Sequence, residues 1–350
     1  MKEIMNAVMY NGTNELEKKM KSYGNSLASL GEKHEDVVCL TADLTSILEV
    51  DIFRDHFPNR FFPMGMAEQN MIGTAAGLAQ ENQVPFASTF ACFLTRRGYD
   101  QIVNSIAYPQ LNVKLTGLMP GISSVGGASH QAIDDIAIMR AVPNMKIIDL
   151  ADATESAIAP QLAYETQGPV YIRLRRGLLP VLFDPKQYKL EWGQSYLLRK
   201  GTDVCIVTSG LMTENALAAA MILERNGVSA SVLHVPSIKP IDEEGIVEAA
   251  ASCRAVLTLD NHSIIGGLGS AVAEVLMDHK VSRPFKRLGI PDQYGKAASM
   301  AYLSRLFELD PDQIAHNSVA LLEGNKKITV SANWEPGGEK TTGWEMEWKN

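Results

Sequence analysis

The chain has 350 residues, more than one ordinary domain of about 100 to 200 residues, so we expect two domains with separate cores. Hydrophobic residues make up 46% and charged residues 21%, which is typical of a folded globular protein. A net charge of −8 argues against a nucleic-acid-binding surface, which needs clustered Lys and Arg. No run of about 18 apolar residues and no signal-like N-terminus occurs, so we expect a cytoplasmic protein without a membrane span.

Short β-rich segments alternate with segments of helical apolar spacing from about residue 23 to residue 176. The predicted strands are 37–42, 84–88, 113–118, 145–150 and 170–173. The predicted helices are 67–80, 94–107, 133–141 and 153–166. This alternation predicts βαβ units on a mainly parallel sheet that is buried on both faces.

Prolines 180 and 185 interrupt this pattern within residues 177–193, which we interpret as the linker to a second domain. The pattern then restarts, with predicted strands at 203–209, 229–235, 255–260 and 285–288, and predicted helices at 213–226, 242–252 and 268–278. We therefore predict an α/β protein of two domains, each with a mainly parallel sheet flanked by helices. The expected divisions are an N-terminal extension 1–20, a first domain 21–180, a linker 181–193, a second domain 194–324 and a tail 325–350.

In α/β sheets ligands bind beyond the carboxyl ends of the strands, so we look for chemical groups in the segments that follow predicted strands. Glu68 opens a helix of small and apolar residues, so it is either a partly desolvated proton donor or an ordinary first-turn glutamate. Phe90 and Phe93 either stack on a planar ring or belong to the core. A loop rich in Gly and Ser delivers His130 to the start of the next predicted helix, where it is either a structural residue or a group that donates and accepts a proton near pH 7.

Several segments in fixed order resemble the pyrimidine-binding domain of transketolases. They are TADL (41–44), MAEQNMIGTAAGLA (66–79), STFACFLTRRGYDQI (88–102), GASHQAIDDIAIMRAVPNM (127–145) and RLRR (173–176). The segment NHSIIGGLGSAVAE (261–274) resembles the C-terminal domain of the same family. The resemblance covers about residues 20–310, and the combination of motifs is far more specific than any one of them.

The resemblance implies a site for thiamine diphosphate. Glu68 matches the glutamate that hydrogen-bonds N1′ of the aminopyrimidine, and Phe93, with Phe90 beside it, matches the aromatic residue that stacks on that ring. Asp43 matches an acid that contacts the cofactor region across a subunit interface, and Arg96 is a further cofactor-binding candidate.

The resemblance also implies a sugar-binding site. His130 matches the histidine that handles hydroxyl protons, and Arg176 or its neighbour Arg175 matches the arginine that binds the sugar phosphate. Three positions depart from the usual pattern and leave the sugar open: Lys21 replaces an arginine, Met119 lies near a missing second histidine, and Gly126 replaces an acid. The substrate-binding candidates are therefore Lys21, Met119, His130, Arg175 and Arg176.

Two motifs that usually hold the diphosphate and its divalent cation, GDG and a later NN pair, do not occur in this sequence. Four dispersed cysteines also give no metal-ligand spacing. We therefore expect no metal on this chain, and Mg²⁺ and the diphosphate on an N-terminal transketolase subunit. The expected assembly is a two-plus-two heterotetramer.

The resulting hypothesis is a subunit of a transketolase that moves a two-carbon ketol unit from an anionic ketose to an aldose. Two alternatives stay open. One is another thiamine-diphosphate reaction, as in 1-deoxyxylulose-5-phosphate synthase or the beta subunit of a 2-oxoacid dehydrogenase. The other is a regulatory subunit that has lost the reaction.

Overall fold

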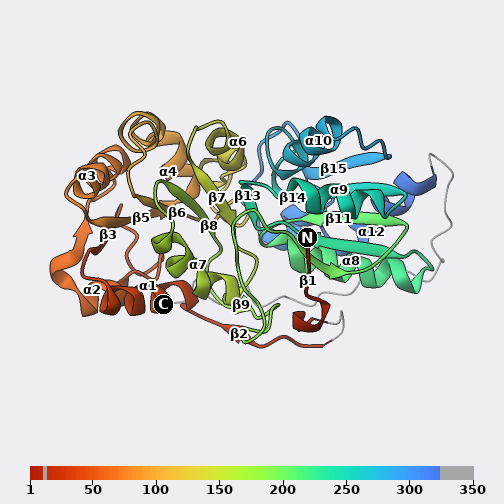
Figure 1. Cartoon of the computed structure of the whole chain (residues 1–350), viewed down its shortest axis with the longest axis horizontal. Coiled ribbons are helices and arrows are strands. Elements are labelled where there is room, and N and C mark those ends of the chain that lie inside the picture. Colours follow the sequence, from red (N-terminus) through yellow and green to blue (C-terminus); the bar gives the residue numbers. More distant parts are fainter. Residues whose placement is uncertain (11–13, 324–350) are drawn as a thin grey trace.

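A computed structural model describes residues 1–10 and 14–323 of the chain. Two sheets lie side by side, and each is covered by helices on both faces (Figure 1). Apart from one short strand in each sheet, the first sheet comes from the first half of the chain and the second sheet from the second half. The predicted fold class is therefore confirmed.

The first sheet has seven strands in the order β13-β7-β8-β6-β5-β3-β4. Six of them are parallel: β3 (Val37–Thr41), β4 (Phe61–Pro63), β5 (Val84–Phe90), β6 (Lys114–Leu118), β7 (Lys146–Asp149) and β8 (Val170–Leu174). β3, β6 and β8 are buried at every residue, because helices cover both faces of a parallel sheet.

Helices flank the first sheet above and below in Figure 1. Below it lie α1 (Ser22–Lys33), α2 (Asp51–His56) and α7 (Ala153–Glu165). Above it lie α3 (Glu68–Gln80), α4 (Ala91–Arg97) and α6 (Asp135–Arg140). Shorter helical segments are Pro58–Arg60, α5 (Tyr99–Gln101), a π-helix at Ile102–Ala107 and a 3₁₀ turn at Ala128–His130.

The second sheet has six strands in the order β1-β10-β12-β11-β14-β15. Their bounds are β1 (Lys2–Glu3), β10 (Tyr196–Arg199), β11 (Val204–Thr208), β12 (Ala230–His234), β14 (Ala255–Ser263) and β15 (Phe285–Ile290). The helices are α8 (Met212–Arg225), α9 (Glu243–Ala251), α10 (Leu268–Asp278), α11 (Met300–Leu306) and α12 (Pro311–Glu323), and a 3₁₀ turn spans Met5–Ala7.

Three short strands tie distant parts of the chain together. β1 from the N-terminus pairs with β10 of the second sheet, and β13 (Ser237–Lys239) from the second half pairs with β7 of the first sheet. β2 (Lys18–Lys19) pairs with β9 (Leu179–Pro180) in the segment predicted as a linker. These pairings depend on residues far apart in sequence, so local periodicity could not predict them.

Two helical segments differ from the expectation. Residues 94–107 were predicted as one helix, but α4 ends at Gly98, where a Cβ atom would lie 2.0 Å from Cδ1 of Ile72 on α3. His130 was expected at the start of a helix, but it closes a 3₁₀ turn before α6. The tail 325–350 lies outside the described residues.

A buried ionic network joins the two halves. The Arg173 guanidinium, 1% exposed, donates to Asp135 through Nε at 2.7 Å and Nη2 at 3.0 Å, to Asp149 at 3.1 Å, and to the carbonyl of Asn261 at 3.0 Å. Burial acts to raise the pKa of Asp135, but Arg173 and His262 outweigh it and the pKa is lowered. At Asp149 burial dominates and raises the pKa to about 6. Arg173 therefore compensates two buried acids and holds one residue of the second half.

We predict that Arg173→Met will lower the free energy of unfolding by about 3–5 kcal/mol, because two buried carboxyl groups lose their cation. Arg54→Met is the control, since Arg54 pairs with Asp55 at the surface and such pairs contribute about 0–1 kcal/mol. Urea unfolding measures both variants. Equal effects of the two substitutions would contradict a central role for the network.

Candidate functional site

The candidate residues lie along the carboxyl-terminal edge of the first sheet, where its parallel strands end. Strands β8, β6, β5, β3 and β4 are parallel neighbours, so the segments that follow them emerge on the same side. Phe90 ends β5, and Glu68 begins α3, the helix after β4. The residues that follow β3, β6 and β8 closely are Asp43, Met119, Arg175 and Arg176. Lys21 precedes α1, which leads back to the start of β3, so it also lies toward this edge.

Three rings form a cluster at this edge. The ring centroids of Phe93 and His130 are 5.2 Å apart, those of Phe90 and His130 are 6.2 Å apart, and those of Phe90 and Phe93 are 5.8 Å apart. His130 meets both phenylalanines edge to face, and its Nδ1 lies 2.9 Å from Oγ of Ser129. All three rings are partly exposed. The cluster therefore combines a flat apolar surface with a group that can carry a proton.

Glu68 lies beside this cluster at the first residue of α3. It is 5% exposed and is the single charged residue of α3. Its Oε1 accepts a hydrogen bond of 2.7 Å from Nη1 of Arg97, and the Arg97 guanidinium lies 4.1 Å above the Phe93 ring. Arg97 thus links the carboxylate to the aromatic cluster.

Arg96, the sequence-predicted cofactor residue, has a different set of contacts. Its guanidinium binds both carboxylate oxygens of Asp134 at 2.7–3.1 Å and the carbonyl of Gln131 at 2.9 Å. The hydrogen bonds that Arg96 donates to Asp134 raise the pKa of Arg96 above its usual value. Arg96 therefore holds the end of the loop that carries His130.

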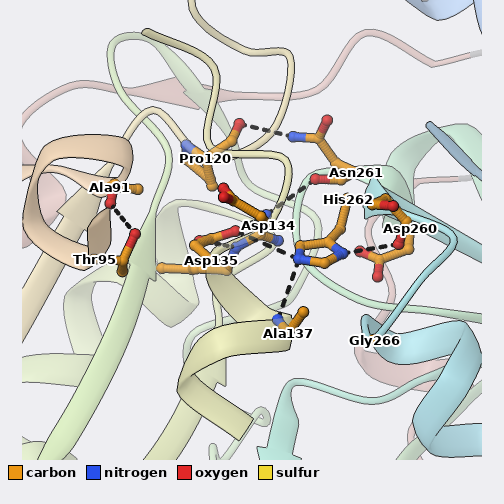
Figure 2. A network of polar contacts seen from close by, with 12 residues as sticks. Ala91, Thr95, Pro120, Asp134, Asp135, Ala137, Asp260, Asn261, His262 and Gly266 are labelled. Carbon is orange, nitrogen blue, oxygen red and sulfur yellow. Dashed lines mark hydrogen bonds and ion pairs between the residues drawn. The ribbon is translucent and has the colours of Figure 1, made fainter. Parts of the chain in front are cut away.

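Asn261 of the second half holds the other end of that loop. Its Nδ2 donates to the carbonyl of Pro120 at 2.9 Å, and its Oδ1 accepts the N–H of Ile122 at 3.0 Å; Figure 2 shows Asn261 reaching Pro120. Ser263 N–H donates to the Ile133 carbonyl at 2.8 Å, beyond His130. The second half of the chain therefore positions the His130 loop on both sides.

Gly126 explains how His130 can pack as it does. A Cβ atom at position 126 would lie 2.9 Å from Cγ of His130 and 3.0 Å from its Cβ. An acidic side chain there would require His130 to move. The hydroxyl of Ser129 supplies the polar contact of Nδ1 instead.

Three further candidates lie at the same edge without belonging to the ring cluster. Lys21 pairs with Asp51 at 3.1 Å. Asp43 is exposed and has a φ of 58°, in the left-handed region, directly after β3. Met119 has a φ of 57°, and its N–H donates to the carbonyl of Leu174 at 3.1 Å.

The two arginines after β8 differ in burial. Arg175 is 8% exposed and its Nη1 lies 3.8 Å from Oε2 of Glu214 in the second half. It lines a cavity of about 310 Å³ between the two halves, together with Lys18 and Arg305. Arg176 is partly exposed, so it is the more accessible of the pair.

Sequence reasoning missed Arg97 and Asn261. Arg97 follows Phe93 by four residues on α4, a spacing that places both side chains on one face, so the sequence held a signal for it. Asn261 lies 139 residues from Ile122, its hydrogen-bond partner, and only the fold reveals that contact.

The fold and the edge cluster define a two-domain α/β protein with a carboxylate and aromatic site at the ends of parallel strands. Family models for the transketolase pyrimidine-binding domain and the transketolase C-terminal domain match residues 19–181 and 193–314. A putative transketolase family protein of Sinorhizobium fredii is 44% identical over 83% of this chain and 85% of its own length. The 6-deoxy-6-sulfo-D-fructose transketolase subunit of a Clostridium species is 39% identical over 84% of this chain and 91% of its own length.

A solved structure described as a split-gene transketolase, inactive beta4 tetramer, has a TM-score of 0.80 and 43% identity. It covers 86% of this chain, and the match covers 97% of that chain. The present chain therefore belongs to the transketolase family. It corresponds to the pyrimidine-binding and C-terminal domain subunit of a split transketolase, as the motif resemblance implied.

Family membership implies the use of thiamine diphosphate, and the edge cluster fits the pyrimidine end of that cofactor. A nearly buried carboxylate lies next to a partly exposed aromatic face, and a planar guanidinium already contacts both. Among residues 1–10 and 14–323, no helix is long and apolar enough to cross a membrane.

We predict that Asn261→Leu will speed amide exchange in residues 119–134, because Pro120 and Ile122 lose buried partners worth about 1–3 kcal/mol each. Hydrogen exchange with mass spectrometry measures the change. Asn226→Leu is the control, since Asn226 is exposed and bonds only within its own helix turn. Unaltered exchange in this loop would show that Asn261 does not hold it.

Proposed function

We propose that this chain is the catalytic second subunit of a two-chain transketolase that transfers a two-carbon ketol unit from a ketose to an aldose. The observation that carries the proposal is the grouping of buried Glu68 with the Phe90, Phe93 and His130 rings at one sheet edge. A carboxylate, a stacking surface and a proton carrier are the side-chain types that this reaction requires.

Thiamine diphosphate supplies a nucleophilic carbon and an electron sink when it is bound. Glu68 would hydrogen-bond N1′ of the aminopyrimidine through its carboxyl group, which is 5% exposed and opens α3 beside the ring cluster. Phe93 would support one face of the ring, and Phe90 packs against Phe93 and fixes its orientation. Asp43, exposed after the neighbouring strand, would face the partner chain.

His130 would move the proton of a sugar hydroxyl as the carbon–carbon bond breaks or forms. Two phenylalanine rings and Ser129 limit its rotation, and the loop that carries it is held at both ends by Arg96 and Asn261. Such restraint keeps a proton-transfer group within reach of its substrate.

The donor sugar is proposed to carry an anionic group at its far end. Arg176 and Lys21 lie at the same sheet edge as His130 and provide cationic groups for it. The Clostridium relative acts, by its name, on a sulfonated ketose, so a sulfonate fits this chain as well as a phosphate does.

The diphosphate and its Mg²⁺ are proposed to bind to an N-terminal transketolase subunit that carries the missing GDG and NN motifs. A cofactor shared by two chains lies at their interface, and twofold symmetry then gives two copies of each subunit. The split-gene relative, whose beta chains alone form an inactive tetramer by its description, supports this division of labour.

Co-expression with such an N-terminal subunit is expected to yield a complex of two copies of each chain, detectable by mass photometry. This chain alone, of 38.2 kDa per copy, should show no transfer activity, because it lacks the cation-binding motifs. Transfer activity of the purified chain by itself would refute the two-chain proposal.

Glu68→Gln in the complex is expected to lower kcat by about 10²- to 10⁴-fold, because the amide cannot exchange a proton with the pyrimidine ring. Transfer from 6-phosphorylated and 6-sulfonated ketoses to an aldose measures kcat. Glu81→Gln, at the exposed end of the same helix, is the matched control and should keep wild-type turnover.

Two results would redirect the proposal. Undiminished turnover of the Glu68→Gln complex would leave this chain a scaffold. Carbon dioxide release from pyruvate, without ketol transfer between sugars, would instead favour one of the other thiamine-diphosphate reactions.

A further inference from the structure

The Arg97 side chain covers the entrance to the carboxylate. Its Nη1 donates to Oε1 of Glu68 at 2.7 Å, and its Cζ lies 4.1 Å from the centroid of the Phe93 ring. Arg97 is 51% exposed at its side chain, whereas the Glu68 side chain is 5% exposed. The guanidinium therefore lies between the buried carboxylate and solvent.

These two contacts are the ones that an aminopyrimidine needs. A guanidinium is planar, carries N–H donors at its rim and stacks on an aromatic face, and in each respect it resembles an aminopyrimidine ring. The same oxygen of Glu68 and the same face of Phe93 cannot serve both groups at once. Arg97 and the cofactor ring therefore compete for one place.

The ion pair also occupies the group that the proposed chemistry needs. Arg97 Nη1 donates to Oε1 of Glu68, so an aminopyrimidine can reach that oxygen only after the guanidinium has left.

We propose that Arg97 is a displaceable placeholder, which occupies the pyrimidine position of this subunit until the cofactor takes it. The proposal rests on the proposed thiamine-diphosphate function. It assigns to Arg97 a role separate from that of its neighbour Arg96, whose bonds to Asp134 and Gln131 fix it to the His130 loop.

Arg97 has the freedom that this role demands. Half of its side chain is exposed, so it can turn outward into solvent without opening the core. While Arg97 contacts both groups, the Glu68 carboxylate has an ionic partner and the Phe93 face is covered. The nearly buried carboxylate is therefore not left unpaired before the subunits assemble. The cofactor binds only those subunits in which Arg97 has turned away. Its apparent affinity is therefore the intrinsic affinity multiplied by the fraction of such subunits.

The test is titration calorimetry of thiamine diphosphate, with Mg²⁺, into the assembled complex of this chain and its N-terminal subunit. Arg97→Ala is expected to lower Kd by about threefold to thirtyfold, because the competing group is gone and every subunit is open. Arg97→Lys is expected to lower Kd less, since an ammonium still pairs with Glu68 but is not planar. Arg54→Ala, another partly exposed arginine that pairs with a carboxylate on α2, is the control and should leave Kd unchanged.

A Kd that is unchanged or raised in Arg97→Ala would overturn the proposal, because an uninvolved or directly binding arginine gives those results. Thermal unfolding of each variant confirms that the complex is intact. Glu68→Ala in the same titration separates the two levels of the argument. A raised Kd for Glu68→Ala without a lowered Kd for Arg97→Ala overturns only the placeholder, whereas no cofactor binding by the wild-type complex overturns both.

Discussion

The buried guanidinium of Arg173 connects the features on which the site depends. It projects from β8, compensates Asp135 at the start of α6 and Asp149 at the end of β7, and donates to the backbone of Asn261. A fully buried cation of this kind is tolerated only when its donors are matched by acceptors, so the positions of these segments are coupled. Asn261, held through its carbonyl, uses its side chain to hold the His130 loop.

The second domain therefore positions part of the site indirectly, through the loop that carries His130. The rings of Phe90, Phe93 and His130 all belong to the first domain, yet the backbone of the second domain and Asn261 hold the loop that brings His130 to the rings. Figure 2 shows the domain junction beside this loop, with Asn261 and His262 facing Pro120, Asp135 and Ala137. The catalytic histidine proposed for the first domain is thus oriented by both.

The cluster has the character of half a site. In the proposed function Glu68 and Phe93 recognise a planar ring and nearby cationic residues recognise an anionic sugar, whereas the sequence lacks the motifs for a diphosphate and its cation. The subunit must stay folded before the partner chain binds. An arginine that neutralises the carboxylate and covers the aromatic face satisfies both groups in the meantime.

The sequence by itself determined the α/β class, most strands and helices, and the transketolase resemblance, because these depend on local periodicity and on short motifs such as MAEQNMIGTAAGLA. It also placed Phe90 and the arginines near strand ends, since parallel strands share an edge, but β4, the strand before Glu68, was not among the predicted strands. Only the tertiary structure decided that Arg97 rather than Arg96 contacts Glu68, that Arg175 is buried against the second domain, and that Asn261 holds the His130 loop. Those facts depend on side-chain direction and on contacts between segments more than 100 residues apart in some cases, and a linear pattern contains neither.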